Sequence, residues 1–248
     1  MFSDEKRCIY RKNQLGEVIC QIRFPEILSI SSKMPADFQE NIRQLFPQFS
    51  ADRESAGNNQ GCFNYRFASA DGVWQLNLTN NFIALTCKKY SNWETFANRL
   101  DAPLSAFIKI YQPAYFERIG LRYLNFISRN KLELSDTPFR EMFDPKYLGL
   151  MADDSANEVA FTCCSCDFDT AIRNGCRAKI HAGLGRVRRN GVDDGEVKFI
   201  YDLDLYTMGN VPVNHAPGVL ETLHAQAFPI FRGAITDTLH EALDPMPI

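Results

Sequence analysis

Apolar and polar residues alternate along several segments of the chain, and this period-two pattern predicts half-buried β-strands. In the clearest segment, 17–24, one face carries Val18, Cys20, Ile22 and Phe24 and the other carries Glu17, Gln21 and Arg23. Further strands are expected at 63–69, 73–79, 82–90, 115–128, 159–172, 176–187 and 196–208. A tight turn is expected at Asp71-Gly72, because glycine accepts a positive φ.

Three segments instead repeat apolar residues at helical spacing. The first covers 34–46 and ends at Pro47. The second runs to about Tyr111, with Ser91 as the expected N-cap, Glu94 completing a capping box and Pro103 producing a kink. The third covers about 217–243 and is expected to break near Pro229. Segment 50–61 is polar and is expected to be a loop.

This order of elements predicts an α+β fold, a curved, mainly antiparallel sheet with helices packed on one face. It lacks the regular strand–helix alternation of a doubly wound parallel sheet. We expect a single compact unit over 1–248. The second half partly echoes the first, which suggests halves at 1–128 and 159–248 joined by an irregular segment, 129–158. The uncovered face of the sheet would be concave.

Composition excludes some classes of protein. The 248 residues are 45% hydrophobic and include 19 Phe, as in folded globular proteins. A net charge of −3 disfavours a nucleic-acid-binding protein. No apolar run is long enough to span a membrane, and the N-terminus has no apolar export signal. The eight cysteines lie mostly in apolar runs, so we expect buried free thiols and a cytoplasmic location.

No segment carries a specific catalytic or metal-binding motif. Cys163-Cys164-Ser165-Cys166 lacks the second cysteine pair of a structural zinc site, so buried strand cysteines are expected there. No nucleophile elbow accompanies the four histidines. Gly183-Leu184-Gly185 lies within a strand, where glycine permits a bulge or the close approach of another backbone. We therefore predict no catalytic residue, no metal and no cofactor.

Two strands of the segment 177–206 carry candidate binding residues. Lys179 and His181 share a face of the first strand, and Asp202 and Asp204 share a face of the second. A two-residue turn at Gly191-Val192 would place Lys179 opposite Asp204 and His181 opposite Asp202. This face would either bind a small ligand or coordinate a metal, or it would form solvated cross-strand ion pairs.

A second candidate surface lies on strand 115–128. Arg118 and Arg122 flank Gly120 on one face of this strand. Two guanidinium groups there could hold an anionic ligand through bidentate hydrogen bonds. The alternative is structural pairing with carboxylates such as Glu17.

The opening segment 10–24, Tyr-Arg-Lys-Asn-Gln-Leu-Gly-Glu-Val followed by a strand that ends in Arg-Phe, resembles a sporadically distributed prokaryotic protein family without an assigned activity. The family usually opens Lys-Asn-Pro-Leu-x-Glu-Val, so this chain departs from it at Gln14. Further similar stretches are 93–96, 116–125 and 239–241. The resemblance implies a stand-alone bacterial or archaeal protein of the kind carried in defence or mobile-element systems. It supplies no catalytic residue.

These observations lead to two hypotheses on function. The first is a non-catalytic binding or adaptor protein that engages a protein partner, because no catalytic constellation accompanies the many aromatic residues. The alternative is a small-ligand-binding domain or enzyme that uses the charged concave sheet face, with Arg118, Arg122, Lys179, His181, Asp202 and Asp204 as the candidate binding residues and a small anion as one possible ligand. Nucleic acid ranks behind both kinds of partner.

Overall fold

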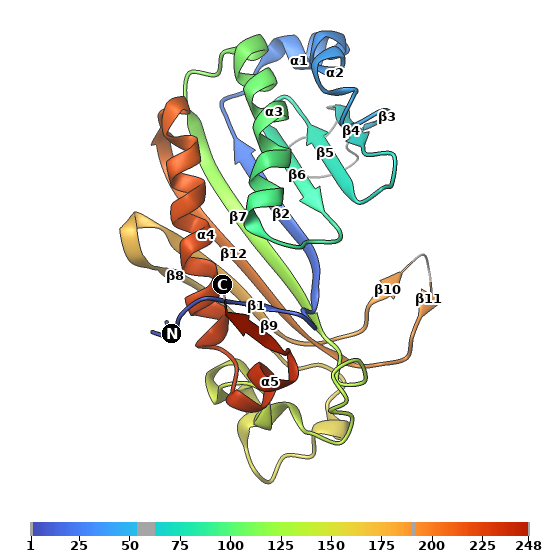
Figure 1. Cartoon of the computed structure of the whole chain (residues 1–248), viewed down its shortest axis with the longest axis vertical. Coiled ribbons are helices and arrows are strands. Elements are labelled where there is room, and N and C mark those ends of the chain that lie inside the picture. Colours follow the sequence, from blue (N-terminus) through green and yellow to red (C-terminus); the bar gives the residue numbers. More distant parts are fainter. Residues whose placement is uncertain (1, 54–62, 190–191, 248) are drawn as a thin grey trace. The chain divides into compact units, whose positions relative to one another are not determined.

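The computed structural model describes residues 2–53, 63–189 and 192–247 (Figure 1). Nine strands form one open, mainly antiparallel sheet in the order β3-β4-β5-β6-β2-β7-β12-β9-β8, and helices pack against it. The α+β class predicted from the sequence is therefore confirmed. The strands are β2 (Leu15–Arg23), β3 (Gln48–Arg53), β4 (Phe63–Ala68), β5 (Trp74–Leu78), β6 (Phe82–Cys87), β7 (Phe116–Ile127), β8 (Ser165–Ala171), β9 (Arg177–Gly185) and β12 (Lys198–Val211).

Smaller elements complete the fold. The two chain ends pair as antiparallel strands β1 (Cys8–Tyr10) and β13 (Pro245–Pro247), and β10 (Arg188–Arg189) pairs with β11 (Val192–Asp193). The helices are α1 (Leu28–Ser32), α2 (Ala36–Ile42), α3 (Trp93–Tyr111), α4 (Ala216–Arg232) and α5 (Asp237–Ala242). Segment 129–158 is irregular as predicted, with the short 3-10 turns η1 (Phe139–Glu141), η2 (Pro145–Tyr147) and η3 (Gly149–Ala152). Among the described residues, no helix combines the length and apolar character needed to cross a membrane.

The chain folds into two compact units that are interleaved along the sequence. Unit 1 consists of Met1–Gly16, Arg122–Leu205 and Leu223–Ile248, and unit 2 consists of Glu17–Leu121 and Tyr206–Thr222. The long elements β2, β7, β12 and α4 each contribute residues to both units. The predicted halves 1–128 and 159–248 coincide with neither unit.

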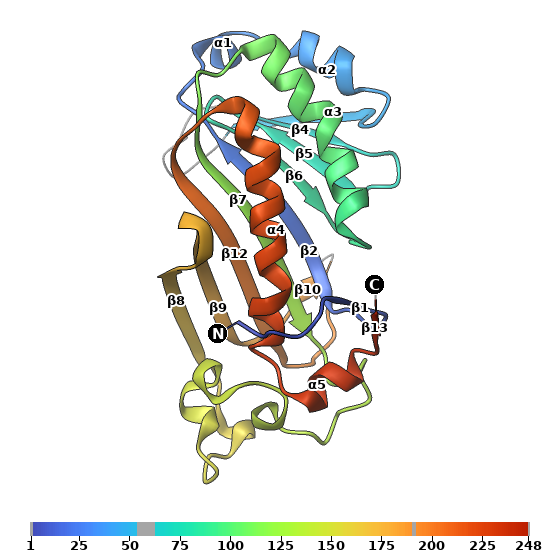
Figure 2. The ribbon, with the colours of Figure 1, turned by 60° about the vertical axis from the view of Figure 1, so that its left-hand side comes forward.

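The core of unit 2 lies between its strands and the helices α2 and α3, which cover one face of them (Figure 2). The ring centroids of Phe24 and Phe107 are 4.6 Å apart, and those of Phe38 and Phe67 are 5.6 Å apart. The alternation predicted for strand β2 is confirmed, since Val18, Cys20 and Ile22 are fully buried while their sequence neighbours are partly exposed.

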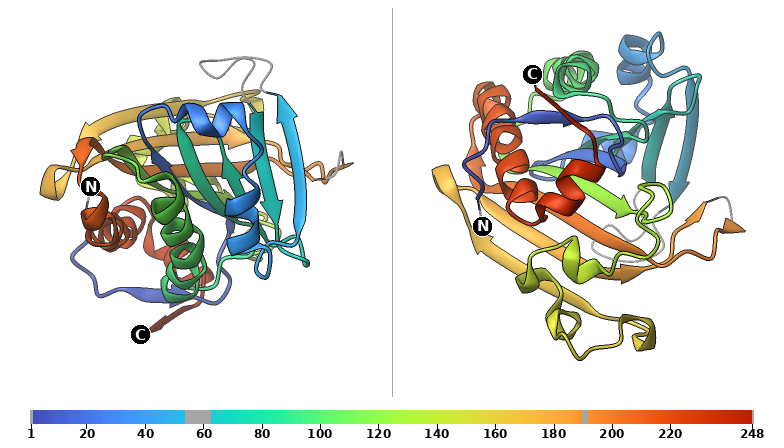
Figure 3. Two further views of the ribbon diagram at one scale, coloured as in Figure 1. Left: turned by 90° about the horizontal axis from the view of Figure 1, so that it is seen from above. Right: turned by 60° about the horizontal axis from the view of Figure 1, so that its bottom comes forward.

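The core of unit 1 lies under the second half of α4 and the irregular segment (Figure 3). On β12, Tyr201 packs against Phe231 of α4, with ring centroids 5.7 Å apart. On β7, the hydroxyl of Tyr123 lies 2.9 Å from Nδ1 of His224 in the same helix. The ring of Phe143 stacks on that of Phe199, with ring centroids 4.1 Å apart. Apolar residues of β7 and β12 therefore face α4, and their polar neighbours face away from it.

Several predicted boundaries are wrong. Residues 50–53 belong to strand β3, all of whose residues are exposed, so no alternation in burial marks it; residues 54–61 lie outside the described part. Strand β8 begins only at Ser165, and residues 158–160, at the start of the predicted strand, form a 3-10 turn. Helix α4 continues through Pro229, and the break before α5 comes after Arg232.

The N-cap of α3 is Asn92, not Ser91, because the Asn92 side chain accepts a hydrogen bond of 2.8 Å from the backbone N–H of Thr95. We expect Asn92→Ala to lower the free energy of unfolding by about 1 kcal/mol. Ser91→Ala is the matched control and should change it by less than about 0.5 kcal/mol. Urea denaturation measures both. Equal losses in the two variants would contradict the assignment of the cap.

Candidate functional site

The six candidate binding residues are divided between the two units. Arg118 belongs to unit 2, where its guanidinium lies 4.6 Å from the centre of the Tyr206 ring. The Arg118 side chain also folds over Gly120, where a β-carbon would lie 2.2 Å from Nη1 of Arg118 and would make this flexible side chain move. The other five, Arg122, Lys179, His181, Asp202 and Asp204, lie in unit 1.

In unit 1 these five residues lie on the sheet face opposite α4, which we call the ion-pair face. Arg122 and Asp202 are there because their neighbours Tyr123 and Tyr201 contact α4. On β9, the buried residues Ala178 and Ile180 alternate with residues of the opposite, partly exposed face. The ion-pair face consists of Arg122, Asp167, Asp169, Arg177, Lys179, His181, Asp202 and Asp204.

Cross-strand pairs occupy most of the ion-pair face. Arg122 donates two hydrogen bonds to Asp202, one of them from Nε to Oδ1 at 2.7 Å. Nδ1 of His181 lies 3.0 Å from Oδ1 of Asp167. Asp169 lies directly opposite Lys179 in the register, but it accepts two hydrogen bonds from Arg177, at 3.0 and 2.8 Å. Across the described residues Lys179 forms no ion pair.

The predicted turn at Gly191-Val192 is wrong, because Val192 pairs with Arg189 in the β10–β11 hairpin. The connecting residues are 190 and 191, which lie outside the described part of the chain. The basis for pairing Lys179 with Asp204 and His181 with Asp202 is thereby removed. His181 is instead bound to β8, and Asp202 to β7.

Solvent exposure limits what the ion-pair face contributes to stability. The side chains of Arg177 and Asp169 are 42% and 44% exposed, and pairs this exposed add between zero and about 1 kcal/mol. A pocket of about 270 Å³ lies in unit 1, but none of the six candidate residues lines it. The role of these six residues in ligand binding stays a prediction.

Strand β8 is an edge of the sheet, and no strand of the described residues pairs with its outer side (Figures 1 and 2). The backbone N–H of Leu184 bonds to the carbonyl of Cys164, and that of Ile172 bonds to the carbonyl of Cys176. In an antiparallel pair this pattern recurs at every second residue, so 166, 168 and 170 bond to β9. The N–H and C=O groups that point away from β9 are those of Ser165, Asp167, Asp169 and Ala171.

Sequence reasoning missed Asp167 and Asp169. The signal was present, because Cys166-Asp167-Phe168-Asp169-Thr170 alternates with period two. Only the contacts between β8 and β9 identify His181 and Arg177 as the partners of these two residues.

The cysteine cluster before β8 is not buried as predicted. Cys163 is exposed, whereas Cys164 and Cys166 are partly exposed. The Cys164 and Cys166 thiols both lie beside Gly149, whose φ of +54° favours glycine. Among the described residues, no group of three or more His, Cys, Asp or Glu is arranged to hold a metal. The predicted close approach at Gly183 is confirmed, since a β-carbon there would lie 2.5 Å from the carbonyl oxygen of Cys164.

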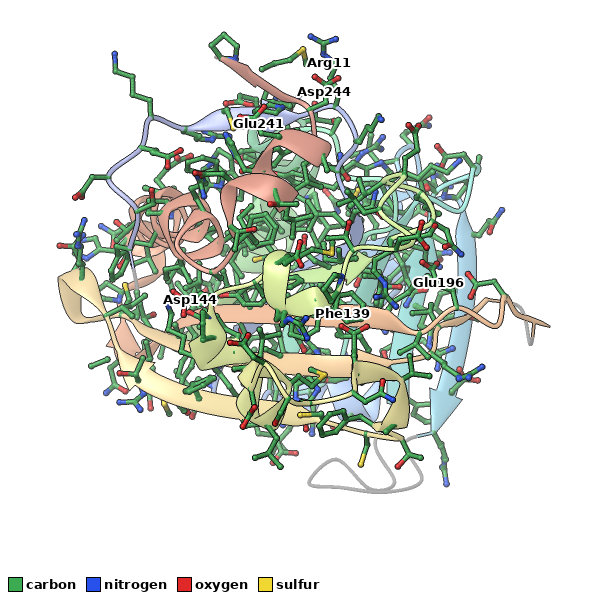
Figure 4. The ribbon with its side chains drawn as sticks, turned by 90° about the horizontal axis from the view of Figure 1, so that it is seen from below. Arg11, Phe139, Asp144, Glu196, Glu241 and Asp244 are labelled. Carbon is green, nitrogen blue, oxygen red and sulfur yellow. The ribbon has the colours of Figure 1, made fainter. Side chains whose placement is uncertain are left out.

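A second polar cluster joins two segments of unit 1, 128–130 and 194–198, around Glu196 (Figure 4). Its carboxylate accepts hydrogen bonds from the Ser128 hydroxyl at 2.7 Å and from the backbone N–H of Asn130 at 3.0 Å. Nζ of Lys198 lies 3.2 Å from Glu196 and 2.5 Å from Asp194. Burial disfavours both charges, but these hydrogen bonds outweigh it, so the pKa of Glu196 is lowered and that of Lys198 is raised.

We expect Glu196→Gln to lower the free energy of unfolding by about 1–3 kcal/mol at pH 7, because Lys198 loses a charged partner. The pKa of Glu196 in the folded state lies below its ordinary value of 4.5. The stabilisation is therefore complete above that value and is lost as the pH falls through the lowered pKa. The difference between the variant and the parent should shrink between pH 5 and about pH 3 in urea denaturation.

The control for this prediction is Glu133→Gln. Glu133 is 85% exposed and its carboxylate is 3.7 Å from Nζ of Lys12. Its replacement should change stability by less than about 0.5 kcal/mol. The prediction would be contradicted if Glu196→Gln lost no more stability than Glu133→Gln, or if its loss were the same at pH 5 and at about pH 3.

Comparison with known proteins adds no functional assignment to this geometry. No family model matches the chain, and no curated protein matches it.

Proposed function

We propose that this protein is a non-catalytic binding protein that engages a protein partner by adding an extended segment of that partner to the open edge of β8. The observation that carries this proposal is the row of outward-pointing backbone groups of Ser165, Asp167, Asp169 and Ala171. Such an edge is a template for a further strand, whose main-chain hydrogen bonds supply affinity.

The side chains of β8 define the chemistry of the partner segment. Residues of the added strand that lie directly opposite Asp167 and Asp169 have their side chains on the same face as these two carboxylates, so basic side chains are favoured there. Asp167 is 64% exposed, and its partner His181 is positive only when protonated. The intervening residues would lie beside Phe168, which packs against Tyr147 with ring centroids 5.7 Å apart. The segment should therefore alternate basic and apolar residues.

The same charges oppose pairing with a second copy of this chain. In an antiparallel pair at this edge, the residues of the added strand whose N–H and C=O groups point toward β8 must lie opposite Ser165, Asp167, Asp169 and Ala171. If two β8 strands met with their centres aligned, Asp167 or Asp169 of one copy would lie opposite an aspartate of the other. Like charges directly opposite are destabilising, so a different protein is favoured as the partner.

The cellular setting belongs to the same proposal. The seven described cysteines are all free thiols, and this supports action in the reducing cytoplasm. The resemblance of segment 10–24 to a sporadic prokaryotic family supports a role in a defence or mobile-element system.

Backbone amide exchange tests the geometry of the edge. In the free protein the amides of Asp167 and Asp169 should exchange faster than those of Phe168 and Thr170, because only the latter bond to β9. Residue-resolved exchange by NMR measures this alternation. Uniform protection along β8 would mean that the outer edge is already covered.

A binding experiment tests the function. We expect a ten-residue peptide of alternating lysine and valine to bind and to protect the amides of Asp167 and Asp169. Asp167→Pro removes one outward N–H without removing a bond to β9 and should weaken binding about tenfold. Titration calorimetry measures the affinity.

Two controls separate strand addition from charge attraction. The same peptide methylated on alternate backbone nitrogens keeps its charge but loses its donors, and it should not bind. Asp153→Asn removes an exposed carboxylate outside β8 and should leave the affinity unchanged. Equal binding of the methylated peptide would overturn the proposal.

A further inference from the structure

The pocket in unit 1 lies where four parts of that unit meet. It is formed by the start of β2, the end of β7 with the turn after it, the base of the β10–β11 hairpin, and the start of β12. Its volume is about 270 Å³, just under the range of pockets that hold drug-sized molecules. It is lined by Asn13, Gln14, Leu15, Phe126, Lys131, Val187, Asp194 and Lys198.

The walls of the pocket are held in place by specific contacts. The backbone N–H of Phe126 bonds to the carbonyl of Gln14 at 2.9 Å. The Phe126 ring lies against Gly16 so closely that a β-carbon at Gly16 would displace it. Glu196, outside the lining, ties the turn that carries Lys131 to Lys198. The pocket is therefore largely preformed, which reduces the cost of ordering it around a ligand.

Of the two lysines that line the pocket, Lys198 forms a salt bridge with Asp194 and Lys131 does not. Lys131 interacts electrostatically with Asp194, yet within the described residues these two groups form no ion pair. Asp194 accepts hydrogen bonds from the backbone N–H of Glu196 and from Lys198, which leaves acceptor capacity on its carboxylate. A cation and an anion thus face the same space at a separation greater than that of a contact pair.

Apolar side chains form the rest of the lining. Leu15, Phe126 and Val187 are each partly exposed, and all three line the pocket. An aromatic ring and two aliphatic side chains favour a ligand with an apolar body. The side chain of Asn13 already accepts a hydrogen bond from the N–H of Leu15, so its amide NH₂ is the group left to donate to a ligand.

We propose that this pocket binds a free α-amino acid with an apolar side chain. The ligand carboxylate lies against Lys131 and the Asn13 amide, its ammonium lies against Asp194, and its side chain packs on Phe126, Leu15 and Val187. A zwitterion suits the site better than an ion, because it joins the separated charges of Lys131 and Asp194 and leaves the net charge of the pocket unchanged. The binding is independent of the β8 edge.

Titration calorimetry with three related probes tests this inference on the full chain. L-phenylalanine should bind, whereas 3-phenylpropionate, which lacks the ammonium, and phenethylamine, which lacks the carboxylate, should each bind about tenfold more weakly. Equal affinity of phenylalanine and 3-phenylpropionate would overturn the proposal in favour of a simple carboxylate site. Absence of saturable phenylalanine binding would overturn it altogether.

Variants test which residue binds each end of the ligand. Lys131→Gln should weaken phenylalanine and 3-phenylpropionate but not phenethylamine, and Asp194→Asn should weaken phenylalanine and phenethylamine but not 3-phenylpropionate. Lys12→Gln is the matched control, because Lys12 is exposed, pairs with Glu133 and does not line the pocket. Loss of binding in this control, or equal effects of Lys131→Gln on all three probes, would contradict the assignment.

A further variant tests the pocket without altering a charge. Gly16→Val should displace the Phe126 ring and abolish phenylalanine binding. Circular dichroism shows whether the variant remains folded. If it does not, Lys131→Gln provides the independent test, because Lys131 is exposed. Unchanged binding in a folded Gly16→Val protein would place the ligand elsewhere.

Discussion

The alternation of side chains across the sheet is the constraint on which the two units depend. On β12, Tyr201 and Leu203 are buried while Asp202 and Asp204 lie on the other face. Because the side-chain period of a strand is two, a shift of one residue would turn Asp202 toward α4 and expose Tyr201. Such a shift would bury an unpaired carboxylate, so the register is strongly specified. The positions of the ion pairs and of the edge groups follow from this register.

An open sheet has edges, and their chemistry decides what can be added to them. The two edges here are β3 and β8, and both are short strands that carry charged residues. Asp167 and Asp169 leave the main-chain groups of β8 accessible but make pairing between identical strands unfavourable. In the proposed function, the same two carboxylates disfavour self-association and favour a basic partner segment.

The pocket depends on a different kind of constraint. Ser128 and Asn130 are distant in sequence from Lys198, and Glu196 contacts all three. A buried carboxylate requires such donors, because an unsatisfied charge would be costly. The cluster thus fixes one side of a cavity that is also lined by Lys131 and Asp194.

Local patterns in the sequence determined much of the architecture. The burial of Val18, Cys20 and Ile22, the hairpin at Asp71-Gly72 and the α+β class follow from periodicity and turn chemistry, which act between near neighbours. The tertiary structure alone decided which residues meet. Strand register paired His181 with Asp167 rather than Asp202, and chain packing brought Asn13, Phe126 and Lys131 to one pocket. Contacts of this kind depend on which strands become neighbours, and no local period encodes that choice.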